Sequence, residues 1–201
     1  PCTFNVPSAT CDGLLCAACE TAKASRRAPS MRPTCKPASR EMLLKQNDLQ
    51  PGDCISCDHF LSPVKGRTIS SSGYSSSSQG VSCGTLYVDH ATGWIFVRNQ
   101  RSTNVDETIR GKLLLEREAA DVGVRIKKYH ADNGVFSSEE FRQHCESLNQ
   151  GLDFSGVGAK FQNGVAERGI QTVSNMARAN MLHATMRWPG KKFLDLWPFA
   201  I

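Results

Sequence analysis

The sequence predicts a mixed α/β fold in which one sheet is flanked by helices. Two observations lead to this prediction. From residue 54 onward, short runs rich in β-branched and aromatic residues alternate with segments whose apolar residues recur at helical spacing. The expected order is β-β-β-α-β-α-β-α, and a chain of 201 residues is long enough to bury one such core with a small appendage. Functional groups are then expected at strand ends and helix starts.

The first 51 residues are expected to form a separate part of the chain. They hold few large apolar side chains, and three prolines stand among their cations, which are Lys23, Arg26, Arg27, Arg32, Lys36, Arg40 and Lys45. Such a composition does not build a core and is typical of a linker or arm, which also suits contact with phosphates. We therefore divide the chain into a basic, Pro-rich linker at 1–51 and a folded core at 52–201.

The first half of the core is predicted to hold three strands and a helix. The run CISCDHFLSPV from Cys54 favours a strand, and the Ser-rich stretch 70–82 is typical of an inserted loop. GTLYVDHATGWIFVRNQ predicts a hairpin that turns at 90–93. A helix should then start at Asn104, with Glu107 completing a capping box, keep its apolar spacing through Leu113, and stop at Gly123.

The second half is predicted to hold two more strands and two helices. Residues 124–130 favour a strand, and Ser137 with Glu140 forms a capping box for a helix that Gly151 ends. The short apolar piece LDFSGV follows. The last helix is expected from about Asn163 to Met186, with an apolar stripe of Ile170, Val173, Ala177, Met181 and Ala184. Glu167, three residues before that stripe begins, is expected on its buried side.

Charge and cysteine usage bound the class of protein. The 24 Lys and Arg outnumber the 19 Asp and Glu, so the net charge of +5 and the pI of about 8.8 suit an anionic partner. The nine cysteines come without a secretory signal pattern, so reduced thiols in an intracellular protein are expected. No apolar run is long enough to cross a bilayer, and no membrane partner is expected.

Three carboxylates are candidates for one metal site. Asp58 lies on the first predicted strand, Asp132 follows the fourth in the stretch YHADNGVFSSEEF, and Glu167 lies in the first turns of the last helix. They converge if the first and fourth strands are neighbours. Three hard oxygen ligands at one point suit Mg²⁺, and a pair of such ions supports in-line phosphoryl transfer. The alternative for Asp132 alone is a strand closed by a turn.

Four stretches carry a family resemblance: PGDCISCDHF, GTLYVDHATGWIFVRNQ, YHADNGVFSSEEF and FSGVGAKFQNGVAERGIQTVSNMARANMLHA. They resemble the integrase of copia-type LTR retrotransposons, part of the retroviral integrase group, over most of the chain from Gly52 to Ile201. The 35 positions from Asp132 to Glu167 are close to that family's spacing. The resemblance implies a ribonuclease H-like mixed five-stranded sheet flanked by helices. It also implies that Asp58, Asp132 and Glu167 bind Mg²⁺ or Mn²⁺, with Asp53 and Asp89 as rivals for the first position.

The resemblance further implies an enzyme that processes retroelement DNA ends and joins them into target DNA. Its partners would be both DNAs and further copies of itself, and it would act in the nucleus after a stage in a cytoplasmic particle. Four residues around the third acid are candidates for DNA contact, namely Lys160, Gln162, Asn163 and Arg168. For each of them a solvated polar face is the alternative. Two other functions stay open, a ribonuclease H-like nuclease and a catalytically inactive relic that only binds DNA.

Cys16 and Cys19 resemble the second half of the integrase zinc module, which makes 1–51 a truncated remnant of that module joined to the linker. The first half of the module is a pair of histidines, and no histidine precedes His59. Zinc is therefore expected only where an intact upstream module exists. A zinc ribbon that adds Cys54 and Cys57 is the alternative. Because those two cysteines fall inside a predicted strand, two strand thiols are favoured over the ribbon.

Overall fold

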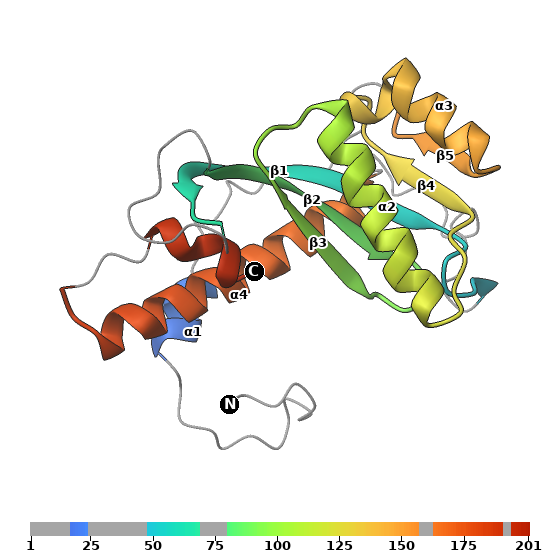
Figure 1. Cartoon of the computed structure of the whole chain (residues 1–201). Coiled ribbons are helices and arrows are strands. Elements are labelled where there is room, and N and C mark those ends of the chain that lie inside the picture. Colours follow the sequence, from blue (N-terminus) through green and yellow to red (C-terminus); the bar gives the residue numbers. More distant parts are fainter. Residues whose placement is uncertain (1–16, 24–47, 69–79, 157–162, 191–193) are drawn as a thin grey trace, which may run out of the picture.

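The core of the protein is one five-stranded sheet in the order β3-β2-β1-β4-β5 (Figure 1). The computed structural model describes residues 17–23, 48–68, 80–156, 163–190 and 194–201. The strands are β1 (Ile55–Gly66), β2 (Val81–Asp89), β3 (Ile95–Gln100), β4 (Lys128–Ala131) and β5 (Gly151–Phe154). β1, β2 and β3 pair antiparallel, whereas β4 pairs parallel with both β1 and β5. The predicted mixed five-stranded sheet is confirmed.

Helices cover both faces of this sheet. α2 (Val105–Asp121) and α3 (Glu139–Ser147) enclose the main core, where Tyr87, Leu115, Tyr129 and Phe141 are almost completely buried. The long helix α4 (Gly164–Arg187) crosses the opposite face against β1 and β2 (Figure 1). Two short 3₁₀ turns complete the described elements, η3 (Val135–Ser137) and η5 (Leu194–Phe199). None of the described helices combines the length and apolarity needed to cross a bilayer.

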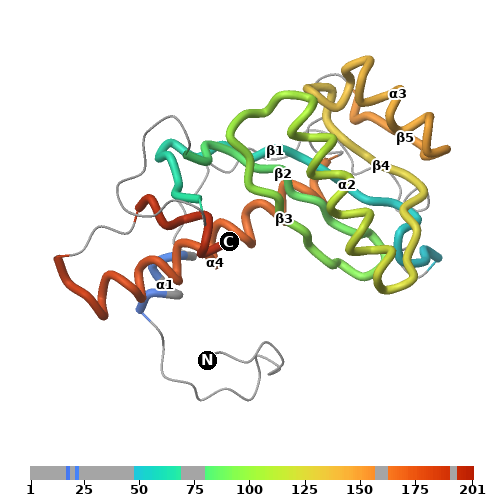
Figure 2. Tube along the Cα trace, in the orientation of Figure 1, coloured from blue at the N-terminus to red at the C-terminus, as the bar shows by residue number. Residues whose placement is uncertain are grey.

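The arm expected at 1–51 contains a helix. α1 (Ala17–Lys23) lies along α4 in both views (Figures 1 and 2), and its Ala18 and Ala22 are buried. Arg178 of α4 donates from Nη1 to the carbonyl of Ala22 at 2.9 Å. Small alanines allow the two helices to approach closely, which composition alone does not reveal. The expectation of a bare linker is therefore corrected for residues 17–23, while 1–16 and 24–47 lie outside the described residues.

The predicted helix starts are right to within a residue, but the capping contacts differ. Asn104 makes no side-chain cap, and Glu107 instead accepts hydrogen bonds from the backbone of Arg101 and Ser102. The cap of α3 is Ser138, whose hydroxyl accepts from the N–H of Phe141, and not Ser137, which belongs to η3. Both differences arise because the preceding turn sets which side chain reaches the open amides.

The apolar spacing expected for α2, through Val105, Ile109, Leu113 and Ala120, was wrong at two positions. Leu113 and Ala120 are exposed, while the buried side of that helix is formed by Thr108, Gly111, Lys112, Leu115 and Ala119. A lysine on the buried face is unusual and needs a partner. The hairpin predicted around 90–93 is confirmed, with Gly93 at a φ of 71° where the chain reverses.

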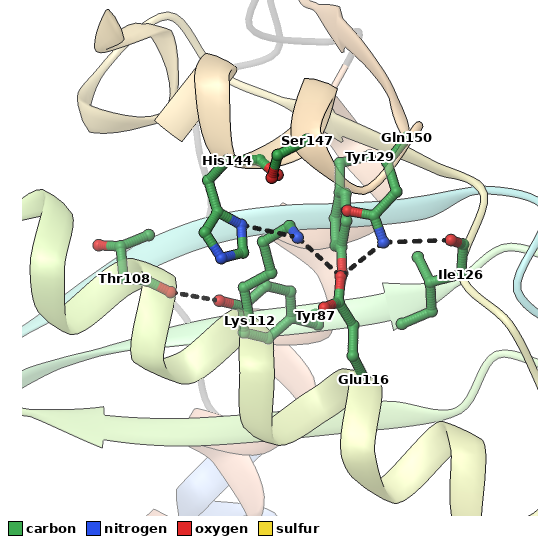
Figure 3. Close-up of polar contacts among 9 residues, drawn as sticks. All are labelled: Tyr87, Thr108, Lys112, Glu116, Ile126, Tyr129, His144, Ser147 and Gln150. Atoms are coloured by element: carbon green, nitrogen blue, oxygen red, sulfur yellow. Dashed lines mark hydrogen bonds and ion pairs between the residues drawn. The ribbon is translucent and has the colours of Figure 1, made fainter. Parts of the chain in front are cut away.

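That buried lysine belongs to a polar network between α2, β4 and α3 (Figure 3). Three donors meet on one oxygen, Oε1 of Glu116: Lys112 Nζ at 2.7 Å, the Tyr129 hydroxyl at 2.8 Å and Gln150 Nε2 at 2.6 Å. The Lys112 ammonium also lies 3.2 Å from Nδ1 of His144 and over the Tyr129 ring. The network therefore ties α2 to the strand that leads to Asp132 and to the helix that follows it.

The charges of this network offset one another. Burial raises the pKa of Glu116, but hydrogen bonds from Lys112 and Gln150 outweigh it, so the pKa of this carboxyl lies below its usual value. Glu116 therefore contributes stability that is present above its unfolded pKa and is lost as pH falls through the lower folded value. Removing one partner of such a pair leaves an uncompensated charge away from water.

We expect Lys112→Met to lower the free energy of unfolding by about 2 to 3 kcal/mol. The loss should stay at the low end for a broken buried pair, because Tyr129 and Gln150 still donate to Glu116. Urea unfolding at pH 7 measures the effect. Arg117→Met removes an exposed cation from the same helix and is the matched control. Equal stabilities for the two variants would show that the network contributes nothing.

Candidate metal and DNA site

The pairing of β1 with β4 places two of the three acids side by side. The parallel register joins Ile55 with Tyr129, then Ser56 with His130, and ends with Cys57 opposite Ala131. Asp58 and Asp132 are the next residues on the two strands. Because parallel strands present equivalent positions to the same face, both side chains lie on the same face of the sheet, at the point where β4 ends. We call this place the acid edge.

The start of α4 is held against the acid edge. Asn163, which precedes the helix, is buried and donates from Nδ2 to the carbonyl of Cys57 at 3.3 Å. Ala166 is fully buried, and a side chain at Gly169 would meet Leu86 and Val88 at 2.9 Å. The small residues in these turns let the helix lie close to the sheet.

Glu167 is exposed, and the expectation that it lies on the buried side of α4 is wrong. The sheet contact is made by its neighbours Ala166 and Gly169, which are small enough to fit there. Along the predicted stripe only Ala177 is buried. Glu167 therefore projects from the first turn of the helix at the end where Asn163 meets β1.

Asp58 feels the charges of the other two acids. Burial raises the pKa of Asp58 to about 6, a hydrogen bond from the His59 amide opposes the rise, and the negative charges of Asp132 and Glu167 add to it. Like charges raise an acid's pKa only when they lie near it. The charged form of Asp58, on the central strand β1, is therefore disfavoured.

The donor set suits a divalent cation in its chemistry. Carboxylate oxygens are the ligands that Mg²⁺ prefers, and a cation would relieve the repulsion that raises the pKa of Asp58. Within the described ranges, however, no three Asp, Glu, His or Cys side chains are grouped in a way that could hold a metal ion. One oxygen of each strand acid is engaged locally: Asp58 Oδ1 accepts from the His59 amide at 2.7 Å, and Asp132 Oδ1 from the Asn133 amide at 2.6 Å. The second oxygen of each carboxylate accepts none of these local bonds and is the atom suited to ligation.

Both rivals of Asp58 have structural tasks. Asp89 is buried and accepts from the amides of Gly52 and Thr92 and from the Thr92 hydroxyl, which holds the hairpin turn. Asp53 pairs with Lys127 at 2.6 Å, and hydrogen bonds from that lysine and from the Gln50 amide lower its pKa. Asp58, by contrast, has no cation among its described contacts.

The four residues expected to contact DNA lie in different settings. Lys160 and Gln162 fall outside the described residues. Asn163 is only 3% exposed, so for this residue the structure corrects the expectation of a surface contact: its amide is bonded to the Cys57 carbonyl near the start of β1. Arg168 is exposed beside Glu167, and its Nε donates to the Gly164 carbonyl at 3.0 Å, which leads its side chain back toward the start of α4.

The cysteines give no described zinc site. Cys16 lies outside the described residues and Cys19 lies on α1. Cys54 and Cys57 are free thiols at the start of β1, and burial raises the pKa of both. Since zinc binds the thiolate, this setting opposes the ribbon that would use them.

Several residues at the acid edge escaped the sequence analysis. On the face that carries the acids, two residues earlier on each strand, Ser56 Oγ lies 2.7 Å from Nε2 of His90, and His130 Nε2 lies 3.3 Å from Ser155 Oγ. On the other face, burial lowers the pKa of His59 to about 4, so this imidazole is neutral at pH 7. Strand alternation predicts which face of the sheet each side chain lies on, but the hydrogen-bond partner of each side chain comes from a distant segment of the chain.

The fold is that of the ribonuclease H-like core of retroviral integrases. It is similar to a chain in the simian T-cell lymphotropic virus intasome in complex with PP2A regulatory subunit B56 gamma, with a TM-score of 0.53 and 17% identity over 75% of this chain. The match spans 47% of that chain, about half its length. Trimeric and dimeric forms of the HTLV-2 integrase catalytic core domain with magnesium give TM-scores of 0.49 and 0.48, each at 19% identity over 76% of this chain and over 84% and 85% of theirs. No protein-family model matches the sequence, and neither does any curated protein.

The raised pKa of Asp58 predicts a pH dependence of stability. The folded protein keeps this proton up to about pH 6, whereas the unfolded chain releases it near the ordinary value of 3.8. The folded state therefore binds more protons between these values, and the contribution of Asp58 to stability falls as pH rises through this interval. With EDTA present, Asp58→Asn should unfold at higher urea than wild type at pH 7, and the difference should shrink toward pH 4.5. A gap that is constant with pH would contradict the raised pKa.

Proposed function

We propose that this chain is the catalytic core of an integrase, a divalent-metal-dependent polynucleotidyl transferase that processes retroelement DNA ends and joins them into target DNA. The single observation that carries the proposal is the register of β1 with β4 in an integrase-like sheet, which brings Asp58 and Asp132 to adjacent positions, while Asn163 holds the start of α4, with Glu167 in its first turn, against β1. The motifs that resemble copia-type integrases support assignment to that group of elements.

The roles of the residues follow from their places in the fold. Asp58 and Asp132 would act as metal ligands from adjacent strands, and Glu167 would close the set from α4. None of the three is expected to form a covalent bond to the substrate. Asn163 sets the distance between the helix start and β1, because its amide is bonded to the carbonyl next to Asp58.

The reaction is an in-line exchange of phosphodiester bonds. A water molecule, or in the second step a DNA 3′-hydroxyl, attacks phosphorus and loses its proton, while the bond to the leaving 3′-oxygen breaks and that oxygen gains a proton. Bound Mg²⁺ ions would supply activation of the attacking oxygen and stabilisation of the leaving one. The chain itself contributes a fixed edge of the sheet on which three carboxylates can hold those ions.

DNA is the proposed partner, both the element's ends and the target. The net charge of +5 and the exposed Arg168 beside Glu167 suit a phosphate backbone, and the cations of the first 51 residues would add affinity that does not depend on sequence. Joining two ends to one target favours an assembly of several copies. Such a reaction places the site of action in the nucleus, after a stage in a cytoplasmic particle.

We expect Asp132→Asn and Glu167→Gln to abolish transfer while leaving DNA binding intact. Each change keeps the side chain's shape but removes one negative ligand, so Mg²⁺-dependent transfer should fall by a factor of about 100 or more, whereas phosphate contacts are made elsewhere. The assay should use a preassembled branched DNA on which an integrase core reverses strand transfer. Filter binding measures DNA affinity in parallel.

Matched controls are Asp106→Asn and Glu146→Gln, which each remove one exposed carboxylate charge, from α2 and α3, that is not among the proposed ligands. If wild type joins DNA and either site variant stays within about threefold of its rate, a change under 1 kcal/mol, the proposed triad is wrong. Wild type that cuts DNA without joining it would indicate a nuclease. DNA binding without any chemistry would indicate an inactive relic.

Arg168→Ala is expected to weaken DNA binding and to reduce its dependence on salt. One lost phosphate contact releases about one counterion fewer, so the slope of log affinity against log salt should fall by about one. Arg187→Ala, which removes an exposed arginine at the other end of α4, is the control. Fluorescence anisotropy over a salt series measures both slopes, and equal slopes for the two variants would remove Arg168 from the interface.

A further inference from the structure

His59 stands where the pairing of β1 with β4 stops. The last paired residues are Cys57 and Ala131, one position before Asp58 and Asp132. The backbone amide of His59 is the group that holds Asp58 Oδ1 at 2.7 Å. Anything that fixes His59 therefore also fixes the backbone from which Asp58 projects.

The first contact of the His59 ring is to α2. Its Nε2 lies 3.1 Å from the hydroxyl oxygen of Thr108, which donates its own proton to the carbonyl of Asn104 at 2.9 Å. With that proton used, the hydroxyl accepts, so His59 carries its hydrogen on Nε2 and donates it. Thr108 is completely buried, which makes this a bond shielded from water.

The second contact of the ring is to the segment that follows Asp132. His59 stacks on Phe136, with ring centroids 4.6 Å apart and an angle of 22° between the planes. Phe136 is 1% exposed and meets Phe141 of α3 edge to face, so it is a rigid support for the imidazole. Phe136 lies four positions after Asp132, and the stack thus joins the two acid-bearing segments beyond the last strand pair.

We propose that His59 is a positioning residue, whose ring bridges Thr108 and Phe136 and thereby sets the distance between Asp58 and Asp132 for metal binding. This inference rests on the proposed function. The imidazole combines a flat face for the stack with an N–H for the bond to Thr108. Phenylalanine keeps the face without the donor, and glutamine keeps a donor without the face.

The test measures divalent-ion binding by thermal unfolding of the full chain, in EDTA and over a MnCl₂ or MgCl₂ series. His59→Phe and Thr108→Val each remove one side of the buried hydrogen bond, and both should raise the ion concentration at half-maximal stabilisation about tenfold. The double variant should be no worse than the more affected single variant, because the two changes remove the same bond. His59→Gln should fall between wild type and His59→Phe.

A positioning role also predicts a split in kinetics. Transfer by Thr108→Val on the branched DNA should be slow at limiting Mn²⁺ and recover to within about threefold of wild type at saturating Mn²⁺, with DNA affinity in EDTA unchanged within twofold. His183→Gln, an exposed histidine on α4, is the control and should match wild type throughout. If His59→Phe does not fold, Thr108→Val and His59→Gln decide the question.

The outcomes separate the two proposals. If wild type is stabilised by the ion and the His59 and Thr108 variants keep their midpoints within twofold, the positioning role is overturned while the proposed function stands. If additive losses appear in the double variant, the two residues act independently and the bridge is likewise overturned. If wild type shows neither ion-dependent stabilisation nor transfer, the proposed function fails, and the role of His59 fails with it.

Discussion

The parallel pairing of β1 with β4 is the constraint on which the rest of this structure depends. β1 is the central strand, held on its other side by β2, so its position is fixed by two neighbours. The ladder to β4 ends just before Asp58 and Asp132, which brings two acids from distant parts of the sequence to the acid edge. A slip of one residue in this register would turn one acid toward the opposite face of the sheet.

Two layers hold the acid edge from opposite sides. On one face the buried Lys112 and Glu116 network joins α2 to β4 and α3, and the His59 ring contacts α2 and η3. On the other face Asn163 ties the start of α4 to the carbonyl of Cys57. Buried hydrogen bonds of this kind are costly to leave unmade, so they fix one arrangement of the elements around the acids.

The acid edge also carries an electrostatic conflict that a cation would resolve. Asp58 is partly buried and feels two neighbouring carboxylates, so its charged form is disfavoured and its pKa rises to about 6. A protein that needed only stability would place a neutral or cationic group there. Perturbed pKa values cluster at functional sites, and this one lies within the central strand β1.

The sequence by itself determined the order of strands and helices along the chain and the hairpin, because periodicity and turn residues are local patterns. Only the tertiary structure decided which residues hold the elements around Asp58 and Asp132. Lys112 contacts His144, which is 32 positions away, and His59 contacts Thr108, which is 49 positions away. Asn163 is buried and Glu167 is exposed, the reverse of what was expected, since burial near the start of α4 depends on where the sheet approaches the helix. Such contacts follow from packing over long separations, which no local pattern encodes.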